Sequence, residues 1–179
     1  MPKGLKETSS QIEISFSLSE TASNTFTTDR IDLQLNALDN EVFVVTGVKM
    51  DLLSPDINLS GAAQNVRAFV AAGLTKQAVT AIPSLGSPSC FATAKETIIL
   101  SEQGAPGFGA VAVAFQENGN DTPASLDYID IIATPDFFVS IVGGSNSNPK
   151  TVAGKLYGYR ARADAAVYAA LVQSEVLSQ

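Results

Sequence analysis

Apolar and polar residues alternate with a period of two along most of this chain of 179 residues. The clearest example is the segment 12–18, in which isoleucine, phenylalanine and leucine alternate with glutamate and serine. Segment 31–36 shows the same alternation, and 41–54 is a longer run whose first half is apolar at both parities. Such a period is typical of strands that bury one face, because successive side chains point to opposite faces. The pattern predicts a protein built mainly of antiparallel strands.

Further strand-like segments follow, separated by turn-forming residues. Segment 66–73 could be a strand or a short helix, and Gly73 favours the strand. Residues 80–95 contain Pro83, Gly86 and Pro88, which predicts a long loop around Cys90. Eight or nine strands in all, joined by turns, are typical of a sandwich or a barrel. The remaining strands are expected at 97–100, 109–116, 128–133, 137–142 and 152–162.

The C-terminal segment has a different period. Asp164 can cap a helix, and 165–177 contains neither glycine nor proline. Val167, Tyr168, Leu171 and Val172 would share a stripe of about 140° on that helix. Two interpretations remain open: the helix docks on its own sandwich, or it reaches a neighbouring subunit.

The chain is expected to form one domain, since domains commonly have about 150 residues. We divide it into a polar N-terminal arm (1–10), a sandwich (11–163) and a C-terminal helix of the same domain (164–179). The first ten residues lack the apolar stretch of a secretory signal, and no run approaches the roughly 18 apolar residues of a membrane helix. We therefore predict no signal peptide and no transmembrane segment.

Composition excludes much of enzyme chemistry. The chain has no histidine, no tryptophan and a single cysteine, Cys90. No Ser-His-Asp triad, imidazole metal site, cysteine zinc site or internal disulfide can form within it. We predict that it is not an enzyme and that it has no catalytic, cofactor-binding or metal-binding residues.

Charge is the second compositional signal. Eighteen acidic and eleven basic residues give a net charge of −7, which disfavours direct binding to nucleic acid. Charged residues make up 16% of the chain, whereas soluble domains average about 25%. Either the surface is rich in serine, threonine and asparagine, or neighbouring subunits cover much of it.

Three aspartates, Asp127, Asp130 and Asp136, form the densest acidic cluster. Two carboxylates at a suitable separation could hydrolyse a glycosidic bond. The chain has no tryptophan to stack on a sugar, and the spacing of Asp127 and Asp130 would place them on opposite faces of a strand. We therefore disfavour a catalytic role for these residues.

The segment Asn118–Asp121 offers oxygen ligands in a tight loop and could take Ca²⁺. It lacks the regular aspartate spacing and the terminal glutamate of an EF-hand, so a plain turn is favoured. The segment 104–109 is rich in glycine, but a proline within it and the missing Lys-Ser/Thr argue against a phosphate-binding loop.

Lys155, Arg160 and Arg162 form the only local basic cluster, and both arginines have the same parity. Phosphate or anionic-lipid binding is one interpretation, although two or three charges give weak and salt-sensitive binding. Salt bridges to the surplus carboxylates are the favoured interpretation. Phe26, Phe137 and Phe138 could be core or contact residues, and a core position is favoured.

Taken together, the long strands and the loops rich in glycine and proline resemble the single jelly-roll capsid proteins of viruses. Segment 133–144 resembles a late strand pair of that fold, and 152–163 resembles its closing strand, followed here by 168–175. The resemblance implies an all-β fold, a single jelly-roll β-sandwich of about eight strands with a C-terminal α-helix.

The resemblance also implies a function. Such a chain would be a structural virion protein that tiles a shell as pentamers or hexamers of itself, with other capsid proteins as further partners. It would be made in the host cytoplasm and located in the virion. Its N-terminus departs from the basic arm of many capsid proteins, since Lys3 and Lys6 are offset by Glu7. The genome would then be neutralised by other components or separated by an internal membrane. The alternative is a β-sandwich binding module, either glycan-binding or virion-decorating.

Overall fold

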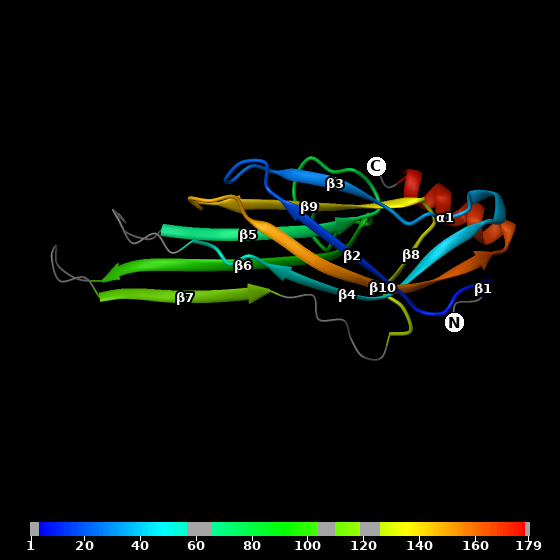
Figure 1. Cartoon of the computed structure of the whole chain (residues 1–179), viewed down its shortest axis with the longest axis horizontal. Coiled ribbons are helices and arrows are strands. Elements are labelled where there is room, and N and C mark those ends of the chain that lie inside the picture. The colour runs from blue at the N-terminus through cyan, green and yellow to red at the C-terminus, as the bar shows by residue number, and fades with distance from the viewer. Residues whose placement is uncertain (1–3, 57–65, 104–109, 119–125, 178–179) are drawn as a thin grey trace.

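The protein is a two-layered β-sandwich with one helix. The computed structural model describes residues 4–56, 66–103, 110–118 and 126–177. In this part of the chain, two antiparallel five-stranded sheets pack face to face, and a helix covers one end of one sheet (Figure 1). The predicted all-β sandwich with a C-terminal helix is confirmed.

Sheet A is arranged around its longest member, β10. Strand β10 pairs with β4 along one edge, and with β2 and then β1 along the other, while β8 extends the sheet beyond β4. The strands of sheet A are β1 (Leu5–Glu7), β2 (Ile12–Ser19), β4 (Glu41–Leu52), β8 (Asp130–Ile132) and β10 (Thr151–Ala163).

Sheet B has the strand order β3-β9-β5-β6-β7, and every pair in it is antiparallel. Among the described strands, β7 pairs only with β6 and so lies at an edge of the sheet. The strands of sheet B are β3 (Thr27–Asp32), β5 (Val66–Thr75), β6 (Cys90–Gln103), β7 (Ala110–Asn118) and β9 (Asp136–Gly144).

The strand order defines a jelly roll. The order β2-β10-β4-β8 faces the order β3-β9-β5-β6, so the chain crosses repeatedly between the two sheets. Eight strands in two such Greek-key sheets are the jelly-roll arrangement. Strands β1 and β7 are additions to it, each at an edge of its sheet. The expectation of about eight strands therefore holds for the jelly roll itself, and the described chain has ten.

The main core lies between the sheets and is centred on Phe137. This side chain is fully buried and meets the rings of Phe16 and Phe91 edge to face, at centroid distances of 6.0 and 6.1 Å. Aromatic pairs favour this geometry because the positive edge of one ring meets the negative face of the other. Burying one such side chain contributes about 1.5–3 kcal/mol. The alternating residues of β2, Ile12, Ile14 and Leu18, pack against this core as predicted.

A β-bulge in β4 changes which residues face the core. Tyr157 pairs with Gly47, but the next residue of β10, Gly158, pairs with Val45, so Thr46 is the extra residue. Before the bulge, Phe43 and Val45 face the sandwich core, while Val42 and Val44 face the opposite side. After it, Val48, Met50 and Leu52 face the core. Val42 and Val44 have the same parity in the sequence as these three residues, but the bulge places them on the opposite face.

Helix α1 (Ala165–Leu177) begins and ends where the sequence predicted. It lies on the outer side of sheet A, where Val42 and Val44 form a second apolar cluster with Leu5, Ala161 and Ala163. The predicted stripe of Val167, Tyr168, Leu171 and Val172 packs against this cluster. Of the two interpretations left open, the structure supports docking of the helix on its own sandwich.

A buried carboxylate fixes the end of α1. Glu175 is only 3% exposed and accepts hydrogen bonds from the backbone N–H groups of Ala133 and Thr134, at 3.0 and 3.1 Å. Burial raises the pKa of this carboxyl group above its ordinary value, and the hydrogen bonds and the charge of Lys76 oppose that effect. The helix is thereby tied to the connection between β8 and β9.

Several element boundaries differ from the prediction. Strand β6 begins at Cys90, so residues 90–95 are strand and the predicted loop at 80–95 ends earlier. Strand β3 ends at Asp32, whereas the sequence placed a strand at 31–36. Between β3 and β4 lies the short 3₁₀ helix η1 (Ala37–Asp39), closed by Asn40 in the left-handed region at φ 52°.

The N-terminal segment takes part in sheet A. Leu5–Glu7 form β1 and pair with Ala161–Ala163 of β10. The carbonyl of Gly4 accepts a hydrogen bond from the N–H of Asp164 at 3.0 Å. Residues 5–7 of the proposed arm are thus strand, in contact with the residue that precedes α1.

Candidate interaction surfaces

The edges of the two sheets differ in their protection against pairing with another chain. Edge strands are usually kept from such pairing by short length, charges or irregularity. In sheet A, β8 has only three residues, and β2 carries Glu13. In sheet B, β3 carries Asp29, Arg30 and Asp32 within six residues. These three edges have at least one of the usual protections.

The β7 edge has none of these protections over most of its length. The strand has nine residues, and the first seven (110–116) include no charged residue and no proline. Among the described residues, no strand pairs with the outer edge of β7. A long apolar edge strand is a template for pairing with another chain. This edge is therefore the candidate surface for assembly.

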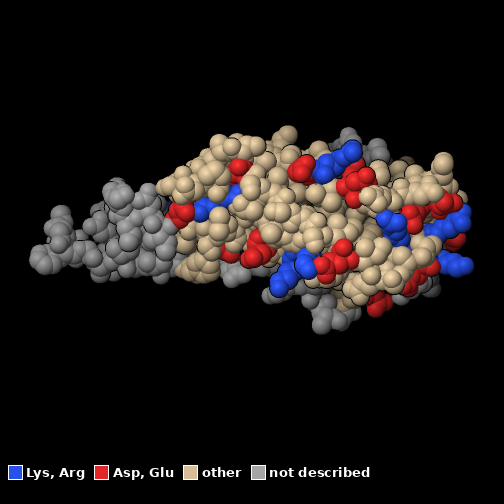
Figure 2. All heavy atoms as spheres, viewed as in Figure 1, with Lys and Arg blue, Asp and Glu red and all other residues tan. Residues whose placement is uncertain are grey.

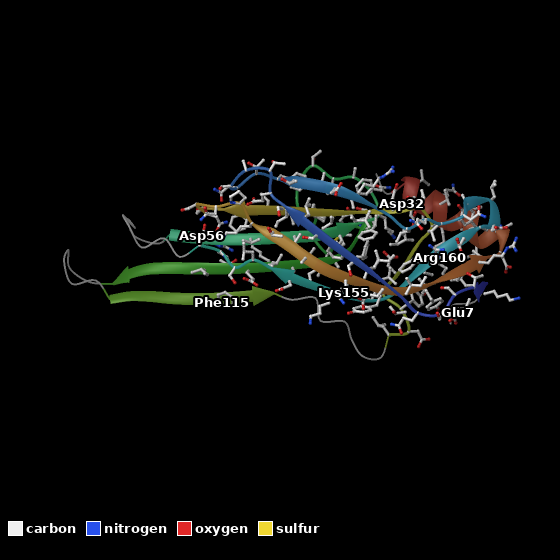
Figure 3. All side chains as sticks on the ribbon, viewed as in Figure 1. Glu7, Asp32, Asp56, Phe115, Lys155 and Arg160 are labelled. Carbon is white, nitrogen blue, oxygen red and sulfur yellow. The ribbon has the colours of Figure 1, made fainter. Side chains whose placement is uncertain are left out.

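The side chain of Phe115 adds an apolar contact to this edge. Phe115 pairs in register with Ile98 of β6, which is 4% exposed, yet Phe115 itself is 55% exposed. At this pair, burial therefore falls sharply from β6 to β7. In Figures 1 and 3, β6 and β7 extend beyond the strands of sheet A, and Phe115 lies on this extension. We call this strand, with the exposed side chain of its Phe115, the β7 edge.

The connections at the same end of the sandwich are held together by buried polar groups. Glu20, 4% exposed, accepts hydrogen bonds from the N–H groups of Gly143 and Lys150, at 2.6 and 2.8 Å. The side chain of Asn146 donates to the carbonyl of Phe69 and accepts from the N–H of Asp56. These bonds join the residues after β2, after β4 and after β9 into one rigid unit.

Lys150 supplies the charge of this network. Its ammonium group is almost fully buried and lies 2.5 Å from a carboxylate oxygen of Asp56 and 2.9 Å from the carbonyl of Ser54. The other oxygen of Asp56 accepts the N–H groups of Ser147 and Asn148. The hydrogen bond from Lys150 holds the pKa of Asp56 below its ordinary value. Asp56 thus links two connections at this end (Figure 3).

The acidic residues singled out in the sequence do not form a common site. Asp130 pairs with Lys76 through both oxygens, at 3.1 and 3.2 Å, and Asp136 pairs with Arg30 at 3.3 Å. Asp130 belongs to sheet A and Asp136 to sheet B, while Asp127 is exposed in the segment before β8. Among the described residues, no group of three metal-binding side chains could hold an ion. The structure does not bring these carboxylates together.

The basic cluster is also divided. Lys155 pairs with Glu13 at 2.5 Å, and Arg162 lies 3.5 Å from Asp39. Arg160 donates to the carbonyl of Leu33 at 3.1 Å, and its buried Nε has no hydrogen-bond partner in the part of the chain that the structure describes. Salt bridges to carboxylates, the favoured interpretation, are confirmed for two of the three side chains.

The other candidate residues have structural positions or lie outside the described chain. Cys90 is buried and free, and its thiol donates to the carbonyl of Ala92 at 3.6 Å. Phe137 is in the core as expected, whereas Phe26 and Phe138 are half-buried and belong to neither apolar cluster. Asn118 ends β7; residues 119–121 of the Ca²⁺ candidate and the segment 104–109 lie outside the described residues.

The face of the molecule in Figure 2 carries few charges, and acidic and basic groups lie next to each other in small sets separated by wide uncharged areas. No helix among the described residues is long and apolar enough to cross a membrane. The low charge density of the sequence is therefore visible as uncharged surface rather than as one large patch of either sign.

Comparison with known proteins gives a distant structural similarity and no family. No family model matches the chain, and no curated protein matches it. Among solved structures, the chain is similar to VP1 of the trichodysplasia spinulosa-associated polyomavirus, solved in complex with GM1 oligosaccharide. The identity is 10%, the match covers 92% of this chain and 97% of VP1, and the TM-score is 0.32. The jelly-roll assignment rests on the strand order described above.

Proposed function

We propose that this chain is a structural virion protein, a capsid subunit that assembles with copies of itself. The observation that carries the proposal is the β7 edge, with its nine-residue strand free of charge over seven residues and its exposed Phe115. A strand of this kind is a liability in a solitary protein and an interface in a subunit that pairs with another.

The rest of the molecule supports the same function. The polar network around Lys150 keeps the connections at one end of the sandwich in fixed positions, which a repeated contact between copies requires. The surface is poor in charge, so large uncharged areas are available for contacts. Each copy carries a net charge of −7, and the copies therefore repel one another at low ionic strength.

The partners follow from this role. Copies of the chain would form pentamers or hexamers, with other capsid proteins completing the shell of a virion. The negative charge disfavours direct contact with the genome, which other components would neutralise or an internal membrane would separate from the shell.

Light scattering coupled to size exclusion tests the proposal, with electron microscopy of the same fractions. We expect defined oligomers or particles whose proportion rises between 50 and 500 mM salt, because salt screens the repulsion. Phe115→Lys should shift the equilibrium towards smaller species, because it places a charge in the contact. Leu38→Lys is the matched control: among the described residues, Leu38 is the most exposed large apolar one, at 94%, and it lies in η1.

A chain that remains monomeric at every salt and protein concentration would overturn the proposal and favour a monomeric binding module. Equal loss of assembly in both lysine variants would show that the β7 edge is not the contact. Circular dichroism of each variant establishes that the fold is intact.

A further inference from the structure

The outer face of sheet A carries a shallow trough that α1 does not cover. Its residues come from three neighbouring strands, β2, β10 and β4. In the register, Ser15, Lys155 and Lys49 form one row across the strands, and Ser17, Ala153 and Asp51 form the next. A third row, on the other side of the first, contains Glu13, Tyr157 and Gly47. Lys155 is labelled near the middle of sheet A in Figure 3.

The trough has a small floor and tall walls. Its volume is about 420 Å³, and Ala153, Gly154 and Ser15 line it beside the longer side chains of Lys49 and Tyr157. Gly154 has no room for a side chain on the core side of the sheet, where a methyl group would lie 2.4 Å from the ring of Phe16. The ring of Tyr157 lies beside Gly47, 3.6 Å from where a Cβ would stand. Gly47 thus keeps the floor low next to the tyrosine.

The trough contains two lysines, and in the described part of the chain only one of them is paired with a carboxylate. Lys155 and Lys49 are directly opposite each other on β10 and β4, and like charges in such a pair repel. Glu13 lies 2.5 Å from Lys155 and neutralises it. Among the described residues, Lys49 has no ion-pair partner, and its side chain is exposed. An anion beside Lys49 would neutralise its charge, as Glu13 neutralises the charge of Lys155.

The remaining groups restrict the ligand further. The π face of Tyr157 can pack against the C–H groups of a pyranose ring, because the ring face is negative and these hydrogens are weakly positive. The carboxylate of Asp51 can accept hydrogen bonds from sugar hydroxyls, and the hydroxyl of Ser15 can donate to them or accept from them. A bare phosphate ion would use the lysines and leave these groups without a role.

We propose that this trough binds a saccharide that carries a carboxylate, with the sugar ring on Tyr157 and the carboxylate on Lys49. Asp51 and Ser15 hold the hydroxyl groups, and Glu13 keeps Lys155 in place. The trough is formed by one chain, so the inference does not depend on the assembly proposed above.

Saturation-transfer NMR tests the inference with two matched probes, methyl β-D-glucuronide and methyl β-D-glucoside, which differ by a carboxylate in place of a hydroxymethyl group. The method works for a free chain and for a large particle alike. We expect transfer to the glucuronide, strongest at the ring protons, and weaker transfer to the glucoside. Lys49→Gln should weaken glucuronide binding about three- to fivefold, which is the scale of one exposed ion pair.

The controls separate this site from the fold and from assembly. Tyr157→Ala should abolish transfer to both sugars. Arg67→Gln removes a charge from an exposed residue of β5 in sheet B and should change nothing. Thermal unfolding establishes that each variant folds; Lys49 is exposed, so its variant remains informative if Tyr157→Ala does not fold.

Three results would overturn the inference: no transfer to either sugar, equal affinity for both, or undiminished glucuronide binding by Lys49→Gln. Displacement of the glucuronide by inorganic phosphate at the same concentration would also overturn it, since the trough would then recognise charge alone. A monomeric chain that binds the glucuronide would keep this inference and overturn the assembly proposal.

Discussion

The ammonium group of Lys150 lies 2.5 Å from the carboxylate of Asp56, and the two partners differ in burial. The side chain of Lys150 is 3% exposed and that of Asp56 is 25% exposed. Water can therefore hydrate the aspartate if it loses its partner, but not the lysine. The cost of breaking the pair depends on which side is removed, because an uncompensated buried charge is the larger penalty.

We expect Asp56→Asn to lower the free energy of unfolding by about 3 kcal/mol, because it leaves the buried ammonium group without a counter-charge. Lys150→Met should cost about 1 kcal/mol, because its chain fills the same space and the remaining aspartate reaches solvent. Urea unfolding followed by circular dichroism measures both values. Equal costs, or a larger cost for Lys150→Met, would contradict this assignment of the buried charge.

The pH dependence of stability should report on Glu175. Burial raises its pKa in the folded state above the unfolded value of 4.5, so the unfolded chain releases this proton first as pH rises. This residue's contribution to stability is therefore greatest below about pH 4.5 and declines until the pH passes the folded-state pKa. Lys76, whose charge acts on Glu175, is paired with Asp130.

We expect Glu175→Gln to remove that decline. As the pH rises from 4.5 to 7, the free energy of unfolding of the natural chain should fall relative to that of Glu175→Gln. Chemical denaturation at a series of pH values measures it. A difference that is constant with pH, or that shifts in favour of the natural chain, would contradict the raised pKa.

How far the sequence predicts this structure depends on whether a feature is local. The boundaries of α1 follow from Asp164, the absence of glycine and proline, and the period of the apolar stripe, all within 14 residues. The start of β6 was missed because Cys90–Ala94 follows Pro88 and contains small residues that alternate weakly. The bulge at Thr46 was missed because the segment before it is apolar at both parities, so a shift of one residue leaves no signal.

The candidate surfaces depend on pairing between distant strands. Lys155 was grouped with Arg160 and Arg162 because they are close in sequence, but opposite parity on β10 separates Lys155 from them. Its neighbours in space are Lys49 and Glu13, from β4 and β2. The sequence predicted a β-rich segment at 109–116, yet nothing local indicated that it would be an edge. That property follows from the pairing order of the whole sheet.

Gly158 should tolerate no side chain. It follows Tyr157 where β10 passes the bulge, and a Cβ there would lie 2.3 Å from the carbonyl oxygen of Val44 and 2.5 Å from the ring of Phe43. The backbone oxygen belongs to the neighbouring strand and cannot move without breaking the ladder. Gly158→Ala should therefore lower the free energy of unfolding by about 2–3 kcal/mol.

Gly86→Ala is the matched control for this substitution. Gly86 lies in the connection between β5 and β6, and a Cβ there would meet the hydroxyl of Ser84 at 3.4 Å, which is an ordinary contact. Its free energy of unfolding should stay within about 0.5 kcal/mol of that of the natural chain. Equal losses in the two variants would show that the effect belongs to glycine in general and not to the close approach of β4 and β10.

The thiol of Cys90 should react slowly in the folded protein. Its side chain is buried at the start of β6, and burial raises its pKa, which lowers the fraction of reactive thiolate at neutral pH. A coloured aromatic disulfide should label less than a tenth of the chains in the time that labels all of them in 6 M guanidinium, because reaction requires local opening.

Ser87→Cys in a Cys90→Ala background is the control: residue 87 is half-buried in the connection before β6, and its thiol should label faster. Labelling of Cys90 as fast as that of the Ser87 position would show that the first residues of β6 open readily, contrary to the paired strand seen here.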